Sequence, residues 1–174
     1  MGTNAGGNYS GTSGGSNAGK GPYSKAMHSR VSNWATRKAA ELEKTSKRQR
    51  DKFTTATVVY DESTGKYYYG MNKGIKKEGT KKNPDLFGDS THKGLLPSKS
   101  LNQYELGNCS EVDAVNKALN SGAKLKNLHI TTIHTTKNNM GNAKVACENC
   151  TYTFKGKVKH NNTGWTKGVR KHGK

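Results

Sequence analysis

The sequence is poor in acidic and apolar residues, and each shortage excludes something. Its 174 residues include 12 Asp or Glu against 30 Lys or Arg, which gives a formal net charge of +18. A protein of this charge attracts polyanions, in the first place nucleic acid. Apolar residues make up 30% of the chain, and no apolar run approaches the ~18 residues that a membrane helix needs. We therefore expect no membrane span, and the first residues also lack the apolar core of a signal peptide.

The chain divides by composition into a leader and a domain. The first 24 residues contain eight glycines and no acidic residue. This composition cannot offset the conformational entropy lost on folding, so residues 1–24 are predicted to be a flexible leader. Residues 25–174 have the size of a single domain. Its last part, residues 151–174, holds seven Lys or Arg and no carboxylate, which predicts a basic C-terminal tail that includes His160 and His172.

Periodicity within the domain predicts helices and strands. Apolar residues recur at helical spacing over about 27–49, and β-branched and aromatic runs at 53–60 and 66–70 flank a polar turn typical of a hairpin. A long irregular connection over 71–107 follows. The remaining pattern predicts a helix at 108–121, a strand at 125–135, a loop at 136–143, a short helix at 146–154 and a further strand at Val158. This order of elements is typical of an α/β fold, in which helices cover a sheet.

The chain has three cysteines, an odd number that cannot all pair within one chain, so a disulfide framework is a poor explanation for them. Cys147 and Cys150 form a Cys-x-x-Cys pair, which suits one zinc ion, and Cys109 begins a predicted helix, where the helix dipole favours a thiolate. One helix and one strand lie between them, so the chain can return and bring the three sulfurs to one Zn²⁺. Three protein ligands leave a fourth position open, as in catalytic zinc sites. Glu111 follows Cys109 by two residues, where its carboxylate can move protons.

Cys109-Ser110-Glu111 and Ala146-Cys147-Glu148-Asn149-Cys150 together resemble the signature of the zinc-dependent nucleotide deaminases, His/Cys-x-Glu followed by Pro-Cys-x-x-Cys. The all-cysteine set and the basic chain are most similar to the YwqJ-like bacterial toxin deaminases, over about residues 27–160. The resemblance implies a three-layer α/β/α sandwich of the cytidine-deaminase type, with a mixed sheet of about five strands. One departure is Ala146, which stands where much of the superfamily has proline.

The same resemblance implies hydrolytic deamination of a nucleobase, with cytosine to uracil as the leading case. Zn²⁺ would be the cofactor, and Glu111 the catalytic proton carrier. The charge of +18 favours single-stranded DNA or RNA, or a flipped-out base, as the substrate. The family also implies a toxin domain, secreted or delivered as the C-terminal part of a larger protein. Such a domain acts in the target-cell cytoplasm and is neutralised by an immunity protein, here an acidic one.

Candidate substrate contacts are weaker than the metal motif. Asn72 follows the hairpin, where it resembles in placement the asparagine that contacts the substrate sugar in related deaminases. Ser110 is a further candidate, and Asn102 and Asn108 are less favoured. An aromatic face on which a base can stack is offered by Tyr104, Tyr152, Phe154 and Trp165, of which Tyr152 is the preferred substrate contact.

Other interpretations of the cysteines stay open at the level of sequence. A structural zinc would need a fourth ligand, with His129 or His134 as candidates, and a disulfide would leave one thiol free. The protein would then be a non-catalytic basic module that binds nucleic acid, and Glu111 would be dispensable. A third alternative is a deaminase of free cytidine, for which the positive charge is incidental.

Overall fold

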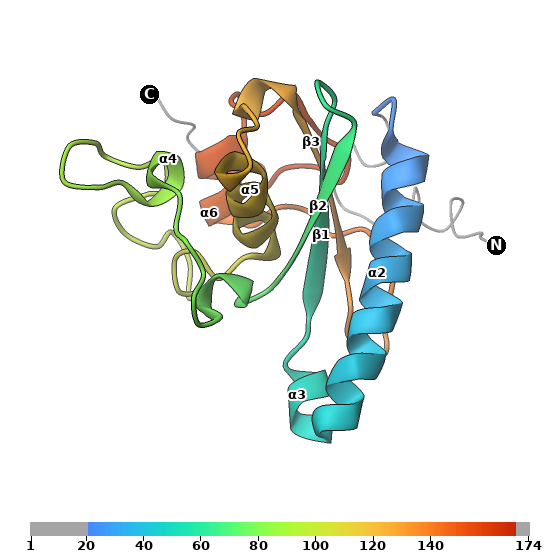
Figure 1. The fold of residues 1–174 in the computed structure, drawn as a ribbon. Coiled ribbons are helices and arrows are strands. Elements are labelled where there is room, and N and C mark those ends of the chain that lie inside the picture. Colours follow the sequence, from blue (N-terminus) through green and yellow to red (C-terminus); the bar gives the residue numbers. More distant parts are fainter. Residues whose placement is uncertain (1–20, 170–174) are drawn as a thin grey trace.

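The computed structural model describes residues 21–169, in which helices lie on both faces of a mixed four-stranded sheet (Figure 1). The strands are β1 (Thr55–Asp61), β2 (Lys66–Met71), β3 (Leu128–His134) and β4 (His160–Asn161), in the order β2-β1-β3-β4. β1 pairs antiparallel with both β2 and β3, whereas β4 lies parallel to β3. The expected α/β fold is confirmed. The sheet has four strands rather than about five, and Val158 lies in the loop before the short β4.

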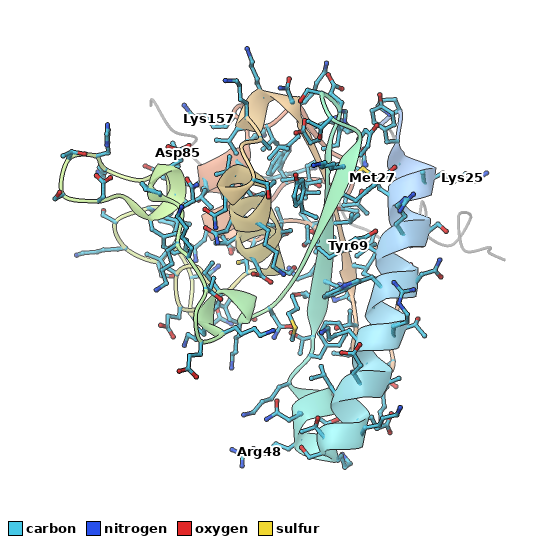
Figure 2. All side chains as sticks on the ribbon, viewed as in Figure 1. Lys25, Met27, Arg48, Tyr69, Asp85 and Lys157 are labelled. Atoms are coloured by element: carbon cyan, nitrogen blue, oxygen red, sulfur yellow. The ribbon has the colours of Figure 1, made fainter. Side chains whose placement is uncertain are left out.

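One face of the sheet is covered by α2 (Ser24–Thr45), which packs on β1 and β3. Met27 is turned towards the sheet and Lys25 away from it (Figure 2), as amphipathic spacing requires. The single helix predicted over about 27–49 is in fact two. Ser46 is extended, and its hydroxyl accepts a hydrogen bond from the backbone N–H of Gln49 (3.0 Å), which caps the short α3 (Lys47–Asp51).

The opposite face is covered by α5 (Ser110–Asn120) and α6 (Glu148–Phe154) (Figure 1). Successive side chains of β1 pack against the helices on opposite faces of the sheet, because neighbouring residues of a strand point to opposite faces. Val58 belongs to the apolar cluster under α2 and Val59 to the one under α5, and both are fully buried. The expected three-layer α/β/α arrangement is therefore present.

The irregular connection between β2 and α5 contains two short helical turns, η1 (Gly74–Lys76) and α4 (Pro84–Phe87), and η2 (Leu125–Asn127) precedes β3. Within residues 21–169, no helix combines the length and the apolar character that crossing a membrane requires. Of the predicted leader, residues 1–20 lie outside the described part of the chain, and Ser24 is the first residue of α2. His172 of the predicted basic tail also lies outside it.

Candidate metal centre

The three cysteines meet on the α5–α6 side of the sheet. Cys109 immediately precedes α5, Cys147 immediately precedes α6, and Cys150 lies in the first turn of α6. Their Sγ atoms all lie within 4.8 Å of one another, and those of Cys109 and Cys147 are 3.1 Å apart. All three are free thiols, and the shortest separation is well above the ~2.05 Å of a disulfide. The arrangement is a cluster of three sulfur donors that could hold a metal ion.

The donor set fits a thiophilic ion such as zinc. Zinc accepts cysteine sulfur at about 2.3 Å, and sulfurs that surround one ion at this distance are separated by less than about 4.6 Å. Cys150 is buried, whereas Cys109 and Cys147 are partly exposed, so the cluster opens to solvent on one side. In residues 21–169, no histidine or carboxylate joins the three sulfurs as a fourth donor. The donor types are consistent with zinc and do not by themselves identify the metal.

Ala146 shows how this chain orders the entry to its Cys-x-x-Cys turn without proline. Its backbone N–H donates to the carbonyl of Gly164 (3.0 Å), within an isolated bridge to Trp165. The Ala146 carbonyl accepts from the hydroxyls of Thr166 (2.6 Å) and Thr151 (3.3 Å). Proline lacks the N–H that the first of these bonds needs. The segment is held by pairing with the chain after β4 rather than by a rigid ring.

The thiols are unequal electrostatically. Hydrogen bonds from Cys109, and secondly from Cys150, lower the pKa of Cys147, because a thiolate there accepts both. The bond to Cys147 raises the pKa of Cys109, whereas the pKa of Cys150 is raised first by its hydrogen bond with Cys109 and then by the one with Cys147, and burial adds to both increases. Cys147 is therefore the sulfur that carries negative charge first, and it is the natural first ligand of an incoming cation.

Glu111 lies in the first turn of α5 and is only 3% exposed. Its Oε1 lies 3.8 Å from Sγ of Cys150, and its Oε2 has no hydrogen-bond partner among residues 21–169. Burial raises the pKa of Glu111, and the charge of Lys144 opposes this effect. An unsatisfied buried carboxylate oxygen is costly, so its position beside a metal-binding cluster calls for a function.

Lys144 was not singled out by the sequence, yet it is the cation of this site. Although burial lowers its pKa, the charges of Glu111 and of the three cysteines together raise it above the ordinary value. Its Nζ donates to the carbonyl of Val145 (3.2 Å), and its backbone N–H donates to Thr132 (2.9 Å), which fixes it beside β3. A lysine three residues before a Cys-x-x-Cys pair has no recognised spacing, so no motif could have identified it.

The predicted substrate contacts lie in different surroundings. Ser110 is fully buried, and its hydroxyl shares hydrogen bonds with Thr57 (2.8 Å), which in turn bonds Thr132 (2.7 Å). Tyr152 is half-buried on α6. Asn72 accepts from the backbone of Thr54 (2.9 Å) and Thr55 (3.1 Å) and donates to the carbonyl of Lys52 (2.8 Å). Asn72 thus joins the ends of the hairpin, and the role of these residues in substrate binding stays a prediction.

The proposed stacking residues divide clearly by exposure. Phe154 is fully buried and Trp165 packs against the core, whereas Tyr104 is 58% exposed. Tyr104 follows a segment whose residue Asn102 donates to Glu148 Oε1 (2.9 Å), so it lies near the start of α6. Of the aromatic candidates, Tyr104 has the most accessible ring.

The two histidines considered as a fourth zinc ligand are not part of the cluster. His129 Nε2 pairs with Glu62 Oε1 (2.9 Å), and the ring packs among aromatic side chains that include Tyr23 and Tyr60. His134, at the end of β3, is half-exposed and is not one of the grouped donors. The described residues therefore give the three cysteines no histidine nitrogen as a fourth metal donor.

Comparison of the chain with protein-family models, with curated proteins and with solved structures gives no match.

Proposed function

We propose that this protein is a zinc-dependent hydrolytic deaminase that converts cytosine to uracil in single-stranded or flipped-out nucleic acid. The proposal is carried by the position of Glu111, whose Oε1 lies 3.8 Å from Sγ of Cys150 and whose Oε2 is unpaired within residues 21–169. In the same described residues the three sulfurs have no fourth protein donor. A structural zinc would leave this carboxylate without a purpose. The resemblance of the two cysteine motifs to the nucleotide deaminases points to the same chemistry.

The cofactor would be held by Cys109, Cys147 and Cys150. When bound, zinc supplies a Lewis acid that lowers the pKa of water from 15.7 to about 7. Three thiolates on Zn²⁺ leave a formal charge of −1, which weakens this effect, and the nearby ammonium of Lys144 offsets that charge. Lys144 therefore acts on the electrostatics of the site rather than on the substrate.

Glu111 performs the proton transfers of the proposed reaction. Its carboxylate takes a proton from the attacking water and delivers it to ring N3 as oxygen adds at C4 of cytosine. It then takes the proton of the hydroxyl now on C4 and passes it to the amino group, which leaves as ammonia as the C4–N bond breaks and the C4=O bond of uracil forms. The raised pKa of Glu111, caused by burial, suits a group that must both accept and release protons near neutral pH. Water and cytosine are consumed, and uracil and ammonia are formed.

We propose further that the activity belongs to a bacterial toxin, delivered as the C-terminal part of a larger protein into the cytoplasm of a target cell. An enzyme that mutates nucleic acid must be restrained where it is made. A net charge of +18 suits an acidic immunity protein that covers the site. Recovery of an acidic binding partner from cells that tolerate the active chain would support this, and tolerance without any such partner would contradict it.

The deciding experiment is to sequence DNA and RNA from cells that express either the wild-type chain or Glu111→Gln. We expect C-to-T changes in DNA or C-to-U changes in RNA with the wild type and none with the variant. A-to-G changes would assign the reaction to adenine, and unchanged nucleic acid would contradict a polymer substrate. Salt-independent turnover of free cytidine would identify the free-nucleoside alternative.

A further inference from the structure

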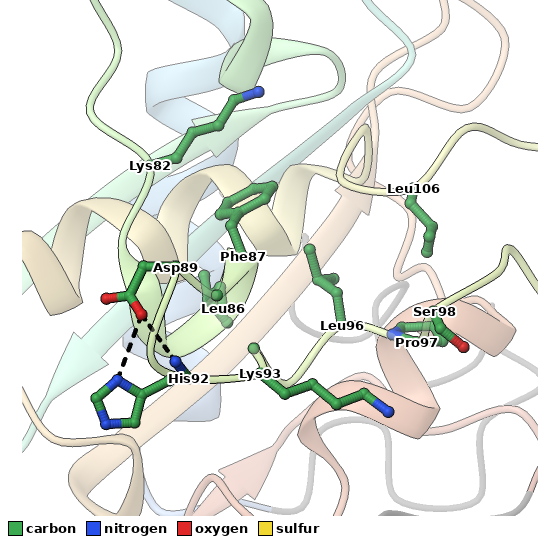
Figure 3. Close-up of a pocket in the computed structure, with 12 residues that line it drawn as sticks. Lys82, Leu86, Phe87, Asp89, His92, Lys93, Leu96, Pro97, Ser98 and Leu106 are labelled. Atoms are coloured by element: carbon green, nitrogen blue, oxygen red, sulfur yellow. Dashed lines mark hydrogen bonds and ion pairs between the residues drawn. The ribbon is translucent and has the colours of Figure 1, made fainter.

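A pocket of about 550 Å³ lies in the irregular connection between β2 and α5. Phe87, Leu96 and Leu106 supply apolar walls, and two exposed lysines, Lys82 and Lys93, extend from its edges (Figure 3). A volume of this size, lined by apolar side chains with a few charged groups, is typical of small-molecule sites. The proposed chemistry at the cysteines makes no use of this pocket.

The pocket is held open by hydrogen bonds of its own backbone. Leu96 N donates to Leu86 O (3.1 Å), and Asp89 N donates to His92 O (2.9 Å). The segment is also tied to α5, because Asn83 N donates to the side chain of Asn116 (2.7 Å). A ligand would therefore meet a preformed site and would not have to order a loose loop.

The charge of the pocket favours an anion. Neither Lys82 nor Lys93 forms an ion pair within residues 21–169. Asp89 is the one carboxylate of its described lining, and it accepts hydrogen bonds from the backbone and hydroxyl of Thr91 and from the backbone of His92, each of 2.8 Å. The carboxylate is thus engaged by its own loop, while both ammonium groups are available to a ligand.

Phe87 provides an aromatic surface between these charges. Its ring is half-buried, and Lys82 Nζ lies 5.5 Å from the ring centroid. The ring edge packs on Gly107, where an added Cβ would stand 3.2 Å from Phe87 Cε1. Gly107 also has a φ of +85°, so a glycine is required there both for backbone conformation and for the seating of this ring.

The pocket adjoins the candidate metal centre through the segment 96–109. Leu106, in its wall, lies three residues before Cys109, a span of at most about 11 Å. The middle of the segment is bound to the Cys-x-x-Cys turn itself: Leu101 N donates to the side chain of Asn149 (2.8 Å), and Asn149 donates to Ser100 Oγ (3.0 Å). One anchored segment therefore lines the pocket at its ends and is bonded to the Cys-x-x-Cys turn in its middle.

We infer that this pocket binds a second nucleotide of a single-stranded nucleic acid whose reacting base occupies the metal centre. The inference rests on the proposed function, which supplies the reacting base at the metal centre. The Phe87 ring stacks on the second base, and Lys82 and Lys93 contact the phosphates that flank it. The metal centre would select the base that reacts, while the pocket would secure the strand and discriminate polymers from free nucleosides.

The test is equilibrium binding of a fluorescent single-stranded oligonucleotide to the full chain over a range of salt concentrations. The Glu111→Gln background keeps the oligonucleotide unreacted, so binding is measured whether or not the protein is a deaminase. We expect the double variant Lys82→Gln, Lys93→Gln to bind the oligonucleotide about tenfold more weakly. The slope of the logarithm of the binding constant against the logarithm of the salt concentration should become shallower by about 1.4, since each phosphate contact on a single strand contributes about 0.7 to it.

The matched control is Lys25→Gln with Lys44→Gln, which removes the same charge from exposed positions on α2, across the sheet from α4 (Figure 2). We expect the control to lose little affinity. If both double variants lost affinity equally, the proposed nucleotide site in the pocket would be contradicted, and only a general effect of positive charge would remain. A specific effect of the pocket pair without any deaminase activity would support the nucleotide site while contradicting the proposed reaction.

Phe87→Leu tests the stacking surface, because leucine keeps apolar packing against Gly107 and removes the π-face. With an oligonucleotide that carries 2-aminopurine, binding to the wild-type ring should quench its fluorescence. We expect Phe87→Leu to abolish the quenching and to weaken binding about tenfold. Quenching that survives in this variant, with an unchanged melting temperature, would contradict the role of Phe87.

Discussion

The α2 face of the sheet and the α5–α6 face are both well packed, but their buried charged groups Arg50 and Glu111 are paired differently. Under α2 and α3, His28 Nε2 donates to the carbonyl of Gly141 (2.7 Å), and Arg50 donates to that of Thr135 (2.9 Å). Both side chains are almost fully buried and satisfied by backbone. Across the sheet, Glu111 has an unpaired oxygen.

The cysteines add to this contrast, because their Sγ atoms contact one another and Oε1 of Glu111. Buried polar groups are normally paired, so a cluster that is only partly paired marks the face that has been shaped for chemistry rather than for stability. The α2 face is expected to behave as a scaffold and the α5–α6 face as a site.

The largest expected effect is a loss of activity without a loss of stability, caused by a substitution in α5. Glu111→Gln should lower deaminase activity by roughly 10²–10⁴-fold, the usual contribution of general acid–base catalysis. Zinc content should be unchanged, and the melting temperature should not fall, because the substitution removes a buried charge that has no partner for Oε2. Uracil formation in an oligonucleotide, metal analysis and thermal unfolding measure the three quantities.

Asp113→Asn is the matched control for this experiment. Asp113 is equally buried on the same helix, but its Oδ2 accepts from the backbone of Met71 (3.0 Å), so it supports the hairpin. We expect this variant to lose stability and to keep its turnover. Activity in Glu111→Gln close to that of the wild type would break the assignment of a proton carrier.

Removal of the metal should destabilise the α5–α6 face of the sheet and leave the α2 face unchanged. With free zinc at 1,000 times its dissociation constant, binding stabilises the folded protein by about 4 kcal/mol, and chelation should remove this amount. The loss follows because the metal no longer links the cysteines at the starts of α5 and α6. Denaturant unfolding with and without chelator gives the free energy, and hydrogen exchange locates it.

We expect protection to fall in α5 and α6 and to persist in α2. A uniform loss of protection across the sheet would show that the metal supports the whole fold, as the structural-zinc alternative requires. An unfolding free energy that is insensitive to chelation, together with zinc-free protein after purification, would contradict a metal centre altogether.

A smaller effect comes from two neighbouring residues of β1. Val58→Ala and Val59→Ala each remove two methyl groups from fully buried side chains, and each should cost about 2 kcal/mol of unfolding free energy. Val58 lies in the apolar cluster under α2, whereas Val59 lies in the cluster that also contains Cys150. Only Val59→Ala should weaken metal affinity, as measured by competition with a zinc chelator. Equal weakening by both variants would erase the distinction between the two faces.

Much of this architecture follows from local sequence signals. The hairpin, the helix before Gly122 and the strand around Ile130 are set by periodicity and turn residues, so their placement was predicted within a few residues. The meeting of Cys109 with Cys147 and Cys150 followed from the order of the elements between them.

What escaped prediction depends on contacts between distant segments. The helix is interrupted at Ser46, which caps α3, although the apolar residues keep helical spacing across this position. Lys144 acquires its role because it is packed beside Glu111 and the cysteines, and Asn149 because its amide holds Leu101. None of these contacts has a fixed separation along the chain that a sequence could reveal.

The smallest expected effect is a pH dependence of the unfolding free energy that arises on the α2 face. Burial lowers the pKa of His28, and the hydrogen bond to Gly141 only partly opposes this. The folded protein therefore holds the neutral form, and the unfolded chain binds the proton more tightly. Stability should be complete above the ordinary pKa of 6.5 and should decline as the pH falls below it, by at most about 1.4 kcal/mol per pH unit for this group.

His134 and His160 also have pKa values lowered by burial, so they add to the same decline. His28→Gln keeps an N–H for Gly141 and cannot titrate, so urea unfolding between pH 7.5 and about 5 should show a shallower slope than the wild type. Because His28 belongs to α2, across the sheet from the cysteines, zinc content at neutral pH should stay the same in this variant. An unchanged slope would mean that His28 binds its proton equally well in the folded protein and in the unfolded chain, so that burial on the α2 face does not disfavour the charged form.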